Sequence, residues 1–368
     1  MSSTSNNIKI QNHIKPSNSE GYTIFPGTLA KSWKDWFSQR SYSSIFILVD
    51  ENTKEKCLPV FLAKTEIHSY LLIEIESGES NKTISTCEKI WSQMMKFSAD
   101  RKSLCINLGG GVIGDMGGFC ASTYKRGIDF VQVPTTLLAQ VDASIGGKLG
   151  IDFNNIKNGI GIFQNPVAVF IDIDFLASLP ERELKSGFAE MLKHALISSE
   201  RDWALLSKEL PEVNAALIYN IANSLKIKKA FIDKDPFEEN IRKALNFGHT
   251  IGHAIESYYI LHKNPILHGE AIAIGIVCES YLSAIVLGFP IEQLEKIVLG
   301  FSKIFPKVEL PENSFDYLIE LMHQDKKNEK NFVNFTLLLE IGKAKINQYP
   351  DKILICNSLK YYLQNYPD

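Results

Sequence analysis

Three histidines and one glutamate are the residues of this chain with the clearest potential for metal chemistry. His249 and His253 lie four residues apart in LNFGHTIGHAIE, so both imidazoles project from one face of a helix. His268 stands at a loop-to-helix junction in ILHGEAIAIG, and Glu190 lies inside the apolar helical segment GFAEMLKHAL. A carboxylate buried there would be costly unless it were paired or bound to a metal. Glu190, His249 and His268 would form a His₂Glu set of the catalytic type, in which three protein ligands leave one position open.

The spacing of the histidines leaves other interpretations open. The pair lacks the glutamate of the H-E-x-x-H zinc motif, and single histidines are usually satisfied core or surface groups. Both His249 and His253 could bind a metal, only one could, or both could be buried polar side chains.

A second set of candidates is cationic. For any single lysine a solvated surface position is the ordinary interpretation, but Lys148 and Lys157 lie among glycines and asparagines, in loops of the kind that often carry function. Because the formal net charge is -3, several converging cations would suit a substrate that carries a phosphate and a carboxylate. The candidates are Arg126, Lys148, Lys157, Lys193, Lys228, Arg242, Lys326 and Lys327, with Asp142 and Asn158 among them.

A glycine-rich turn, GGGVIGD from Gly109 to Asp115, follows a predicted strand and precedes a segment that can start a helix. Glycines let the backbone approach a ligand, and amides at a helix start favour a pyrophosphate. The spacing is not G-x-G-x-x-G, so a plain tight turn is the alternative. Other polar residues follow neighbouring predicted strands, where one ligand could touch them all, although Asp50 taken alone could be a helix cap. These residues are Asp50, Glu79, Lys82, Thr135 and Thr136.

The elements that must position these residues alternate in the first half of the chain. SIFILVD, YLLIEIE, SLCINLG and DFVQVP predict strands, the last stopped by Pro134, and a helical stretch passes through Trp91. This alternation predicts a Rossmann-like α/β domain with a parallel sheet. Helical spacing predominates from about Leu179. We expect a disordered segment over residues 1–20, an α/β domain over 21–180 and a mainly α-helical domain over 181–368.

The composition is that of a soluble globular protein, with 368 residues, 45% of them hydrophobic and 22% charged. The net charge of -3 gives no pull toward nucleic acid or acidic membranes. Six cysteines without a C-x-x-C pair favour a reducing cytoplasm, and the N-terminus lacks the apolar core of a signal peptide. The longest apolar run, EAIAIGIVCESYLSAIVLGF, carries Glu270 and Glu279, which predicts a buried helix instead of a membrane span.

Seven segments together resemble the sugar phosphate cyclases, and among them the 3-dehydroquinate synthase family. They are SGESNK, GGGVIGD, YKRGIDFVQVPTTLLAQVDASIGGK, GFAEMLKHAL, LNFGHTIGHAIE, HGEAIAIG and DKKNEK, and the likeness runs from about residue 20 to 345. The resemblance implies a cytoplasmic homodimer that requires NAD and zinc, or cobalt in its place. It also implies that the enzyme acts second in the shikimate pathway, converting 3-deoxy-D-arabino-heptulosonate 7-phosphate into 3-dehydroquinate and phosphate on the way to chorismate and the aromatic amino acids.

The resemblance also implies roles for single residues. It places Glu190, His249 and His268 on the zinc ligands, and His253 on a substrate contact, which resolves the question that spacing left open. The substrate would contact Arg126, Asp142, Lys148, Asn158, Lys193, Lys228, Arg242, Asn246, His253 and either Lys326 or Lys327. Of these, Lys148, Lys193, Lys228, Arg242, Asn246 and His253 would be catalytic. NAD would be bordered by Glu79, Lys82, Gly111, Asp115, Thr135, Thr136, Lys148, Lys157, Phe175, Leu176, Ala177 and Ser178, with Asp50, Gly110 and Val112 beside them.

The implied chemistry is a transient oxidation at C5, phosphate elimination, re-reduction, ring opening and an internal aldol closure. Two positions depart from the family pattern. Leu149 replaces a threonine and so removes a hydroxyl near the expected cofactor pocket, and Asn240 replaces a glycine, which looks mild because Asn tolerates left-handed backbone angles.

Three rival functions are considered. A valiolone-type or 2-deoxy-scyllo-inosose synthase is disfavoured because Arg242 and Asn246 suit a carboxylate-bearing substrate. A metal-dependent dehydrogenase of the glycerol dehydrogenase type would not need so many cations. A catalytically silent binding protein would be expected to lose a metal ligand or a central lysine, and none is lost.

Overall fold

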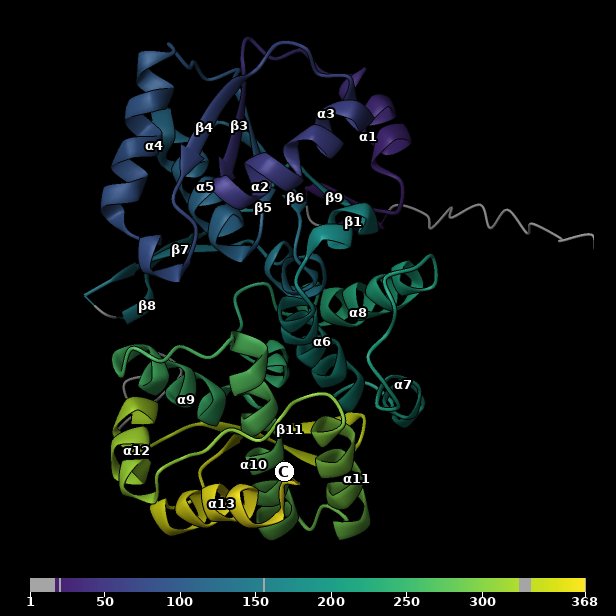
Figure 1. The fold of residues 1–368 in the computed structure, drawn as a ribbon, viewed down its shortest axis with the longest axis vertical. Helices are drawn as coiled ribbons and strands as arrows, with labels where there is room; N and C mark the ends of the chain where they lie inside the picture. The colour runs from purple at the N-terminus through teal and green to yellow at the C-terminus, as the bar shows by residue number, and fades with distance from the viewer. Residues whose placement is uncertain (1–16, 20, 155, 324–331, 368) are drawn as a thin grey trace, which may run out of the picture. The chain divides into compact units, whose positions relative to one another are not determined.

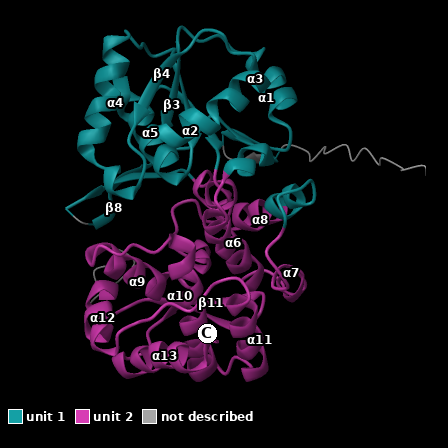
Figure 2. Ribbon diagram, viewed as in Figure 1, with its two compact units in different colours: residues 1–135, 147–178, 212–222 teal, residues 136–146, 179–211, 223–368 magenta. Residues whose placement is uncertain are grey.

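The structure is a computed structural model that describes residues 17–19, 21–154, 156–323 and 332–367. The chain divides into two compact units (Figure 2). Unit 1 comprises residues 1–135, 147–178 and 212–222, and unit 2 comprises residues 136–146, 179–211 and 223–368. The chain therefore passes between the units several times, and the last residue of unit 1 before the long helical part is Ser178.

Unit 1 is built on a sheet of seven strands in the order β1-β2-β9-β6-β5-β3-β4. All neighbouring pairs are parallel except β1 with β2, so six strands form the parallel sheet that the sequence predicts. The strands are β1 (Ser17–Ser19), β2 (Tyr22–Pro26), β3 (Ile45–Asp50), β4 (Leu71–Ile75), β5 (Leu104–Gly109), β6 (Asp129–Pro134) and β9 (Ala168–Ile171).

One prediction for the N-terminus needs correction. Residues 17–19 were expected in a disordered segment, but their backbone pairs with β2 as an antiparallel edge strand. Residues 1–16 and 20 lie outside the described residues.

Helices cover both faces of this sheet (Figure 1). Side chains of a strand alternate between the faces, so Phe46 and Leu48 of β3 join one core while Ile47 and Val49 join the other. The first core includes residues of α4 (Ile84–Lys96) and α5 (Gly111–Thr123). The second includes residues of α1 (Leu29–Phe37) and α3 (Leu58–Thr65). The shorter elements of unit 1 are α2 (Glu51–Lys56), η1 (Glu79–Asn81), η2 (Tyr124–Arg126), η4 (Ile173–Ser178) and the antiparallel pair β7 (Lys148–Phe153) and β8 (Ile156–Phe163).

Unit 2 is mainly helical, as the sequence predicts. Its helices are η3 (Ala139–Ala143), α6 (Glu181–Leu196), α7 (Glu200–Leu206), η5 (Ile241–Asn246), α9 (His249–Leu261), α10 (His268–Leu287), α11 (Ile291–Ser302), η6 (Glu312–Ser314), α12 (Phe315–His323) and α13 (Lys352–Asn365). Helix α8 (Leu217–Ile232) begins in unit 1 and continues into unit 2. A hairpin of β10 (Phe335–Glu340) and β11 (Lys343–Gln348) was not predicted.

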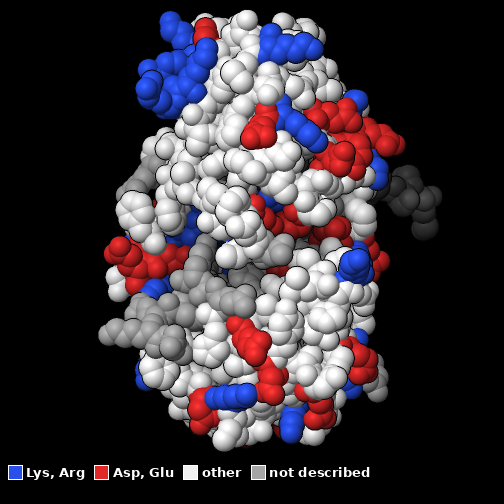
Figure 3. All heavy atoms as spheres, turned by 90° about the vertical axis from the view of Figure 1, so that its left-hand side faces the viewer, with Lys and Arg blue, Asp and Glu red and all other residues white. Residues whose placement is uncertain are grey.

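Helix α10 forms the centre of unit 2, because it packs against α6, α9, α11, α13 and β10. It is the predicted apolar run, and it is long and apolar enough to cross a membrane. However, 67% of its most apolar window is buried inside the protein, which is typical of a core helix. On the face drawn in Figure 3, basic and acidic side chains gather mainly in separate groups.

Candidate active site

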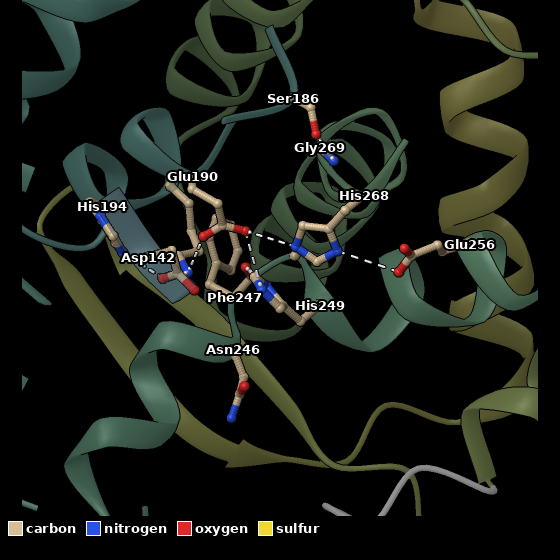
Figure 4. Close-up of polar contacts among 12 residues, drawn as sticks. Asp142, Ser186, Glu190, His194, Asn246, Phe247, His249, Glu256, His268 and Gly269 are labelled. Atoms are coloured by element: carbon tan, nitrogen blue, oxygen red, sulfur yellow. Dashed lines mark hydrogen bonds and ion pairs between the residues drawn. The ribbon is translucent and has the colours of Figure 1, made fainter. Parts of the chain in front are cut away.

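Glu190, His249 and His268 come from three different helices and meet at one carboxylate oxygen (Figure 4). Oε1 of Glu190 lies 3.3 Å from Nε2 of His249 and 3.2 Å from Nε2 of His268. The two imidazole centroids are 5.6 Å apart. The sequence separates Glu190 from the histidines by more than 50 residues, so it is the packing of α6, α9 and α10 that brings the three side chains together.

The outer nitrogen of each imidazole has a hydrogen-bond acceptor. Nδ1 of His249 lies 3.1 Å from the carbonyl oxygen of Phe247, and Nδ1 of His268 lies 3.3 Å from Oε2 of Glu256. An acceptor at Nδ1 places the ring proton there and leaves Nε2 with its lone pair. Nε2 of both rings therefore points to the Glu190 carboxylate, where an ion could take it as a ligand, and the acceptor behind each Nδ1 is the outer shell that such a site needs.

His253 lies beside this group. Its ring centroid is 5.0 Å from that of His249 and 5.7 Å from that of His268. Ligand atoms of the three histidines lie within 4.8 Å of one another, so His253 could also reach an ion placed among them. His249 and His253, which the sequence places one turn apart on a helix, therefore do lie side by side on α9.

The two imidazoles differ in protonation at pH 7: His249 is neutral, whereas His268 carries a proton that a bound ion would displace. Burial would raise the pKa of Glu190, but Lys193 and His249 outweigh it and hold that pKa well below its usual range. Burial and Lys193 lower the pKa of His249 to about 3, so this imidazole is neutral at pH 7. Burial lowers the pKa of His268, but Glu256 and Glu190 outweigh it and raise the pKa to about 9. One carboxylate and two imidazoles that share a point form the donor set of a catalytic zinc site.

A second buried group of charges surrounds Asp142, which lies in the short π-helix η3. Its Oδ1 lies 2.8 Å from Nζ of Lys228, 3.5 Å from Nε2 of His194 and 3.9 Å from Nζ of Lys193. Lys193 also forms an ion pair with Oε2 of Glu190, so it connects the two groups. Burial opposes ionisation of Asp142, but Lys228 and Lys193 hold its pKa well below the usual range.

Arg242 and Asn246 lie in η5, directly before α9. The Arg242 guanidinium is only 2% exposed and donates to the carbonyl oxygens of Pro236 and Gly146, the latter at 3.1 Å. Asn246 donates to Oε1 of Glu238 at 2.9 Å, and in Figure 4 it lies apart from the Glu190 contacts.

Several predicted cofactor residues of unit 1 form a network around Lys82, which is 3% exposed and therefore not a solvated surface lysine. Its Nζ lies 2.7 Å from Oδ2 of Asp115 and 2.7 Å from Oδ1 of Asn158. Glu79 lies 4.0 Å from Lys82 and 3.5 Å from Lys157. Burial lowers the pKa of Lys82, but Asp115 and Glu79 outweigh it and raise the pKa, so the ammonium stays charged.

The glycine turn leads straight from β5 into α5. Gly110 is the N-cap of α5 and offers no side chain, so the backbone N–H groups of the first helical turn, including those of Gly111 and Val112, face outward without a side-chain cap. A Cβ on Gly117 would come within 2.0 Å of Oδ1 of Asn107, so glycine lets α5 lie directly on β5. This is the geometry of an anion site at a helix start.

The family follows from comparison with known proteins. Residues 72–186 match the family model described as 3-dehydroquinate synthase N-terminal, and residues 187–328 match the one described as 3-dehydroquinate synthase C-terminal. The chain is 43% identical over 350 residues to the 3-dehydroquinate synthase of Parabacteroides distasonis, covering 95% of this chain and 99% of that protein. It is 36% identical over 340 residues to the 3-dehydroquinate synthase of Ruminiclostridium cellulolyticum, covering 88% and 92%.

The chain belongs to the 3-dehydroquinate synthase family.

Solved structures agree with the fold of this 3-dehydroquinate synthase family member. The 2-epi-5-epi-valiolone synthase of Streptomyces hygroscopicus subsp. jinggangensis, with NAD+ and Zn2+ bound, has a TM-score of 0.83 at 23% identity, covering 96% of this chain and 99% of that one. A 2-deoxy-scyllo-inosose synthase complexed with carbaglucose-6-phosphate, NAD+ and Co2+ has a TM-score of 0.82 at 23% identity, covering 92% and 96%. At such identities the likeness establishes the fold alone, and that fold is the predicted one.

The remaining predicted cofactor residues have clear structural surroundings. Asp50 is the N-cap of α2: its Oδ1 accepts from the Thr53 backbone N–H at 2.7 Å, which is the capping role considered as the alternative. Thr135 is buried and its N–H donates to the Gly109 carbonyl, whereas Thr136 belongs to unit 2. In η4 the side chains of Phe175 and Leu176 are buried, while Ala177 and Ser178 are exposed. Any contact of Phe175 with a cofactor would therefore come through its backbone.

The two departures from the family pattern have different outcomes from those expected. Leu149 was expected to border the cofactor pocket, but its side chain is 6% exposed and packs in the core under α5, against Gly118. Asn240 was expected to be mild because Asn tolerates left-handed angles, but its φ is -135°, so that argument does not apply. Its backbone N–H instead donates to Asp235 at 2.7 Å.

Two further predictions concern exposed or undescribed cations. Arg126 and Lys148 are exposed on unit 1, and Arg126 has a left-handed φ of 67°. Lys326 and Lys327 lie outside the described residues.

Sequence reasoning missed two residues that contact the candidate site. Glu256 is the last residue of the quoted segment LNFGHTIGHAIE, one turn beyond His253, and an acidic residue in an apolar helix at that spacing was a usable signal. His194 follows Lys193 directly and is fully buried, with Nδ1 2.6 Å from Oγ of Ser224. No local pattern marks that contact, because Ser224 comes from α8.

Proposed function

We propose that this protein is a 3-dehydroquinate synthase, which converts 3-deoxy-D-arabino-heptulosonate 7-phosphate into 3-dehydroquinate and phosphate in the shikimate pathway. The observation that carries the proposal is the 43% identity with the Parabacteroides distasonis synthase over 95% of this chain. The convergence of Glu190, His249 and His268 at one point supports it, because the proposed reaction needs a metal.

The cofactors of the proposed reaction are NAD and one divalent ion, zinc or cobalt. NAD+ occurs together with Co2+ or Zn2+ in the two cyclase structures described above. We assign the ion to Glu190, His249 and His268. When bound, NAD would supply the hydride acceptor and donor for the C5 position, and the ion would supply the Lewis acidity that makes the C5 alcohol easier to deprotonate.

The chain's own residues supply binding and orientation of an anionic substrate. Lys193, Lys228 and Arg242 are each at most 7% exposed, so their charges act with little screening by water. Asp142 holds Lys228 through both its carboxylate and its carbonyl oxygen, at 2.8 Å and 2.6 Å, which fixes the direction of that ammonium. We assign these cations, with Arg126, Lys148, Asn158, Asn246 and His253, to the phosphate, carboxylate and hydroxyls of the substrate.

We assign the Lys82 network and the start of α5 to NAD. A pyrophosphate suits the uncapped amides after Gly110, and Glu79, Asp115, Lys157 and the strand-end threonines offer further polar contacts. We further propose that the protein works as a cytoplasmic homodimer, with no nucleic acid or membrane partner. Its six cysteines are all free, which suits a reducing compartment.

The test is a coupled assay on the purified, zinc-loaded protein. With the heptulosonate phosphate and a catalytic amount of NAD+, phosphate and 3-dehydroquinate should appear in equal amounts while no NADH accumulates. Stoichiometric NADH from a polyol would point to a dehydrogenase instead. Turnover of glucose 6-phosphate, with the heptulosonate phosphate left unchanged, would point to an inosose synthase.

A further inference from the structure

A hydrogen-bond chain runs from His249 away from the proposed metal site through one peptide unit. The carbonyl of Phe247 accepts from Nδ1 of His249 at 3.1 Å. The N–H of the same planar peptide unit belongs to Gly248, and it donates to Oε2 of Glu279 at 2.6 Å. An anion on the N–H side of a peptide polarises its carbonyl, so hydrogen bonds in such a chain strengthen one another.

Glu279 is a fully buried carboxylate in an apolar helix, which is a costly arrangement unless its oxygens are satisfied. Its other oxygen, Oε1, accepts from the backbone N–H groups of Thr250 at 3.0 Å and Ile251 at 3.1 Å. These amides form the first turn of α9, so the carboxylate of α10 caps the helix that carries His249. His249 is the first residue of α9, so these hydrogen bonds hold it in place relative to α10.

His268, the other proposed metal-binding histidine, also has a carboxylate beside its Nδ1. Oε2 of Glu256, on α9, faces Nδ1 of His268, on α10, at 3.3 Å. The two helices thus exchange carboxylates: Glu256 contacts His268 directly, and Glu279 acts on His249 through the Phe247–Gly248 peptide. A carboxylate behind a metal-bound histidine fixes its tautomer and raises its basicity, and the loss of such a partner typically costs ten- to a hundredfold in metal affinity.

We propose that Glu279 is a positioning residue for metal binding, which holds His249 in the Nδ1-protonated tautomer and increases the donor strength of its Nε2. This inference rests on the proposed role of His249 as a ligand. Glu279 acts through the peptide unit between Phe247 and Gly248 and through the first turn of α9.

The test compares Glu279→Gln with the wild type in full-length protein freed of metal. Gln keeps the shape but removes the charge, and it turns an N–H donor toward one of the α9 amides. We expect zinc affinity, measured by competition with a chromogenic chelator, to fall about tenfold, and the visible spectrum of the cobalt-loaded protein to shift. Activity lost at low zinc should return at saturating zinc.

Two variants separate this role from plain stability. Ser283→Ala removes a buried hydroxyl of the same helix, which donates to the backbone carbonyl of Glu279 and accepts from the backbone N–H of Leu338. This variant should have a lower melting temperature and an unchanged zinc affinity. Glu256→Gln should weaken zinc binding through His268. If Glu279→Gln fails to fold, Glu279→Asp, which is too short to reach both sets of amides, takes its place.

The outcomes are distinguishable. If Glu279→Gln binds zinc as tightly as the wild type and only its melting temperature falls, as in Ser283→Ala, the proposal for Glu279 is overturned. The proposed metal site itself would be unaffected by that result. If His249→Ala binds zinc as tightly as the wild type does, His249 is not a metal ligand. The proposed metal site, and with it the basis of this inference, would then be wrong.

Discussion

Gly275→Ala is expected to damage the metal site more than the fold. Gly275 lies in α10, where a Cβ would come within 2.0 Å of the Gly248 carbonyl oxygen and 2.7 Å of the Gly252 nitrogen. Both atoms belong to backbone at or near the start of α9, which cannot rotate away as a side chain can. Reaching an ordinary contact of about 3.4 Å therefore requires a displacement of roughly 1.4 Å between the two helices.

The magnitude of the two effects differs. Overpacking a core typically costs about 1–3 kcal/mol, and replacing a helical glycine by alanine regains about 1 kcal/mol, so the net loss of stability is roughly 0–2 kcal/mol. A zinc–ligand bond tolerates only about 0.2 Å of displacement. Because His249 lies on α9 and His268 on α10, zinc affinity should fall at least tenfold and kcat/KM about a hundredfold.

The assay is a chelator competition with zinc, run beside thermal unfolding and turnover at saturating zinc. Gly300→Ala is the matched control, since Gly300 also lies in a helix of unit 2, but the nearest neighbours of its Cβ would be side-chain atoms, the Trp203 ring at 3.0 Å and the Ser207 Cβ at 3.3 Å. The reasoning is refuted if Gly275→Ala binds zinc as tightly as Gly300→Ala does, because backbone contact would then not set the distance between the imidazoles.

Three further predictions test the other assignments. Lys82→Met removes an ion-pair partner of Asp115 and should raise the Kd for NAD+ at least tenfold by fluorescence titration. His253→Ala should lower kcat at least a hundredfold while the protein keeps its zinc, whereas His249→Ala should lose zinc, as metal analysis of the dialysed proteins would show. Burial would raise the pKa of Asp235, but hydrogen bonds from backbone N–H groups, including that of Arg242, lower it. The ionised Asp235 therefore stabilises the folded protein above the unfolded pKa near 4, and this contribution is lost as the pH falls. Asp235→Asn should therefore cost about 1–2 kcal/mol in denaturant at pH 7, and the difference from wild type should narrow from pH 5 to pH 3.

Much of the local structure could be predicted because it depends on neighbours in sequence. The unbroken apolar run in SIFILVD produced β3, whose Phe46 and Ile47 do face opposite cores, and the apolar run that includes Glu279 produced the buried helix α10. The four-residue offset of His249 and His253 became two imidazoles 5.0 Å apart.

Other local features depend on contacts outside their own segment. Leu149 lies between Lys148 and Gly150, and nothing in this neighbouring sequence shows that it packs under α5 against Gly118. The strand at residues 17–19 has no strong pattern of its own and forms because β2 offers it a partner edge. Asn240 has a φ of -135°, and its N–H donates to Asp235, five residues earlier.

The sequence by itself determined which helices and strands form and which residue types line them, because hydrophobic period, glycines and caps act over a few residues. Only the tertiary structure decided that Glu190 of α6 faces His249 of α9 and His268 of α10, and that Glu256 and Glu279 stand behind the two imidazoles. Those contacts join residues up to 78 positions apart, as between Glu190 and His268. They exist because Gly275 lets two helix backbones touch, so the distances at the site are set by packing that no short segment encodes.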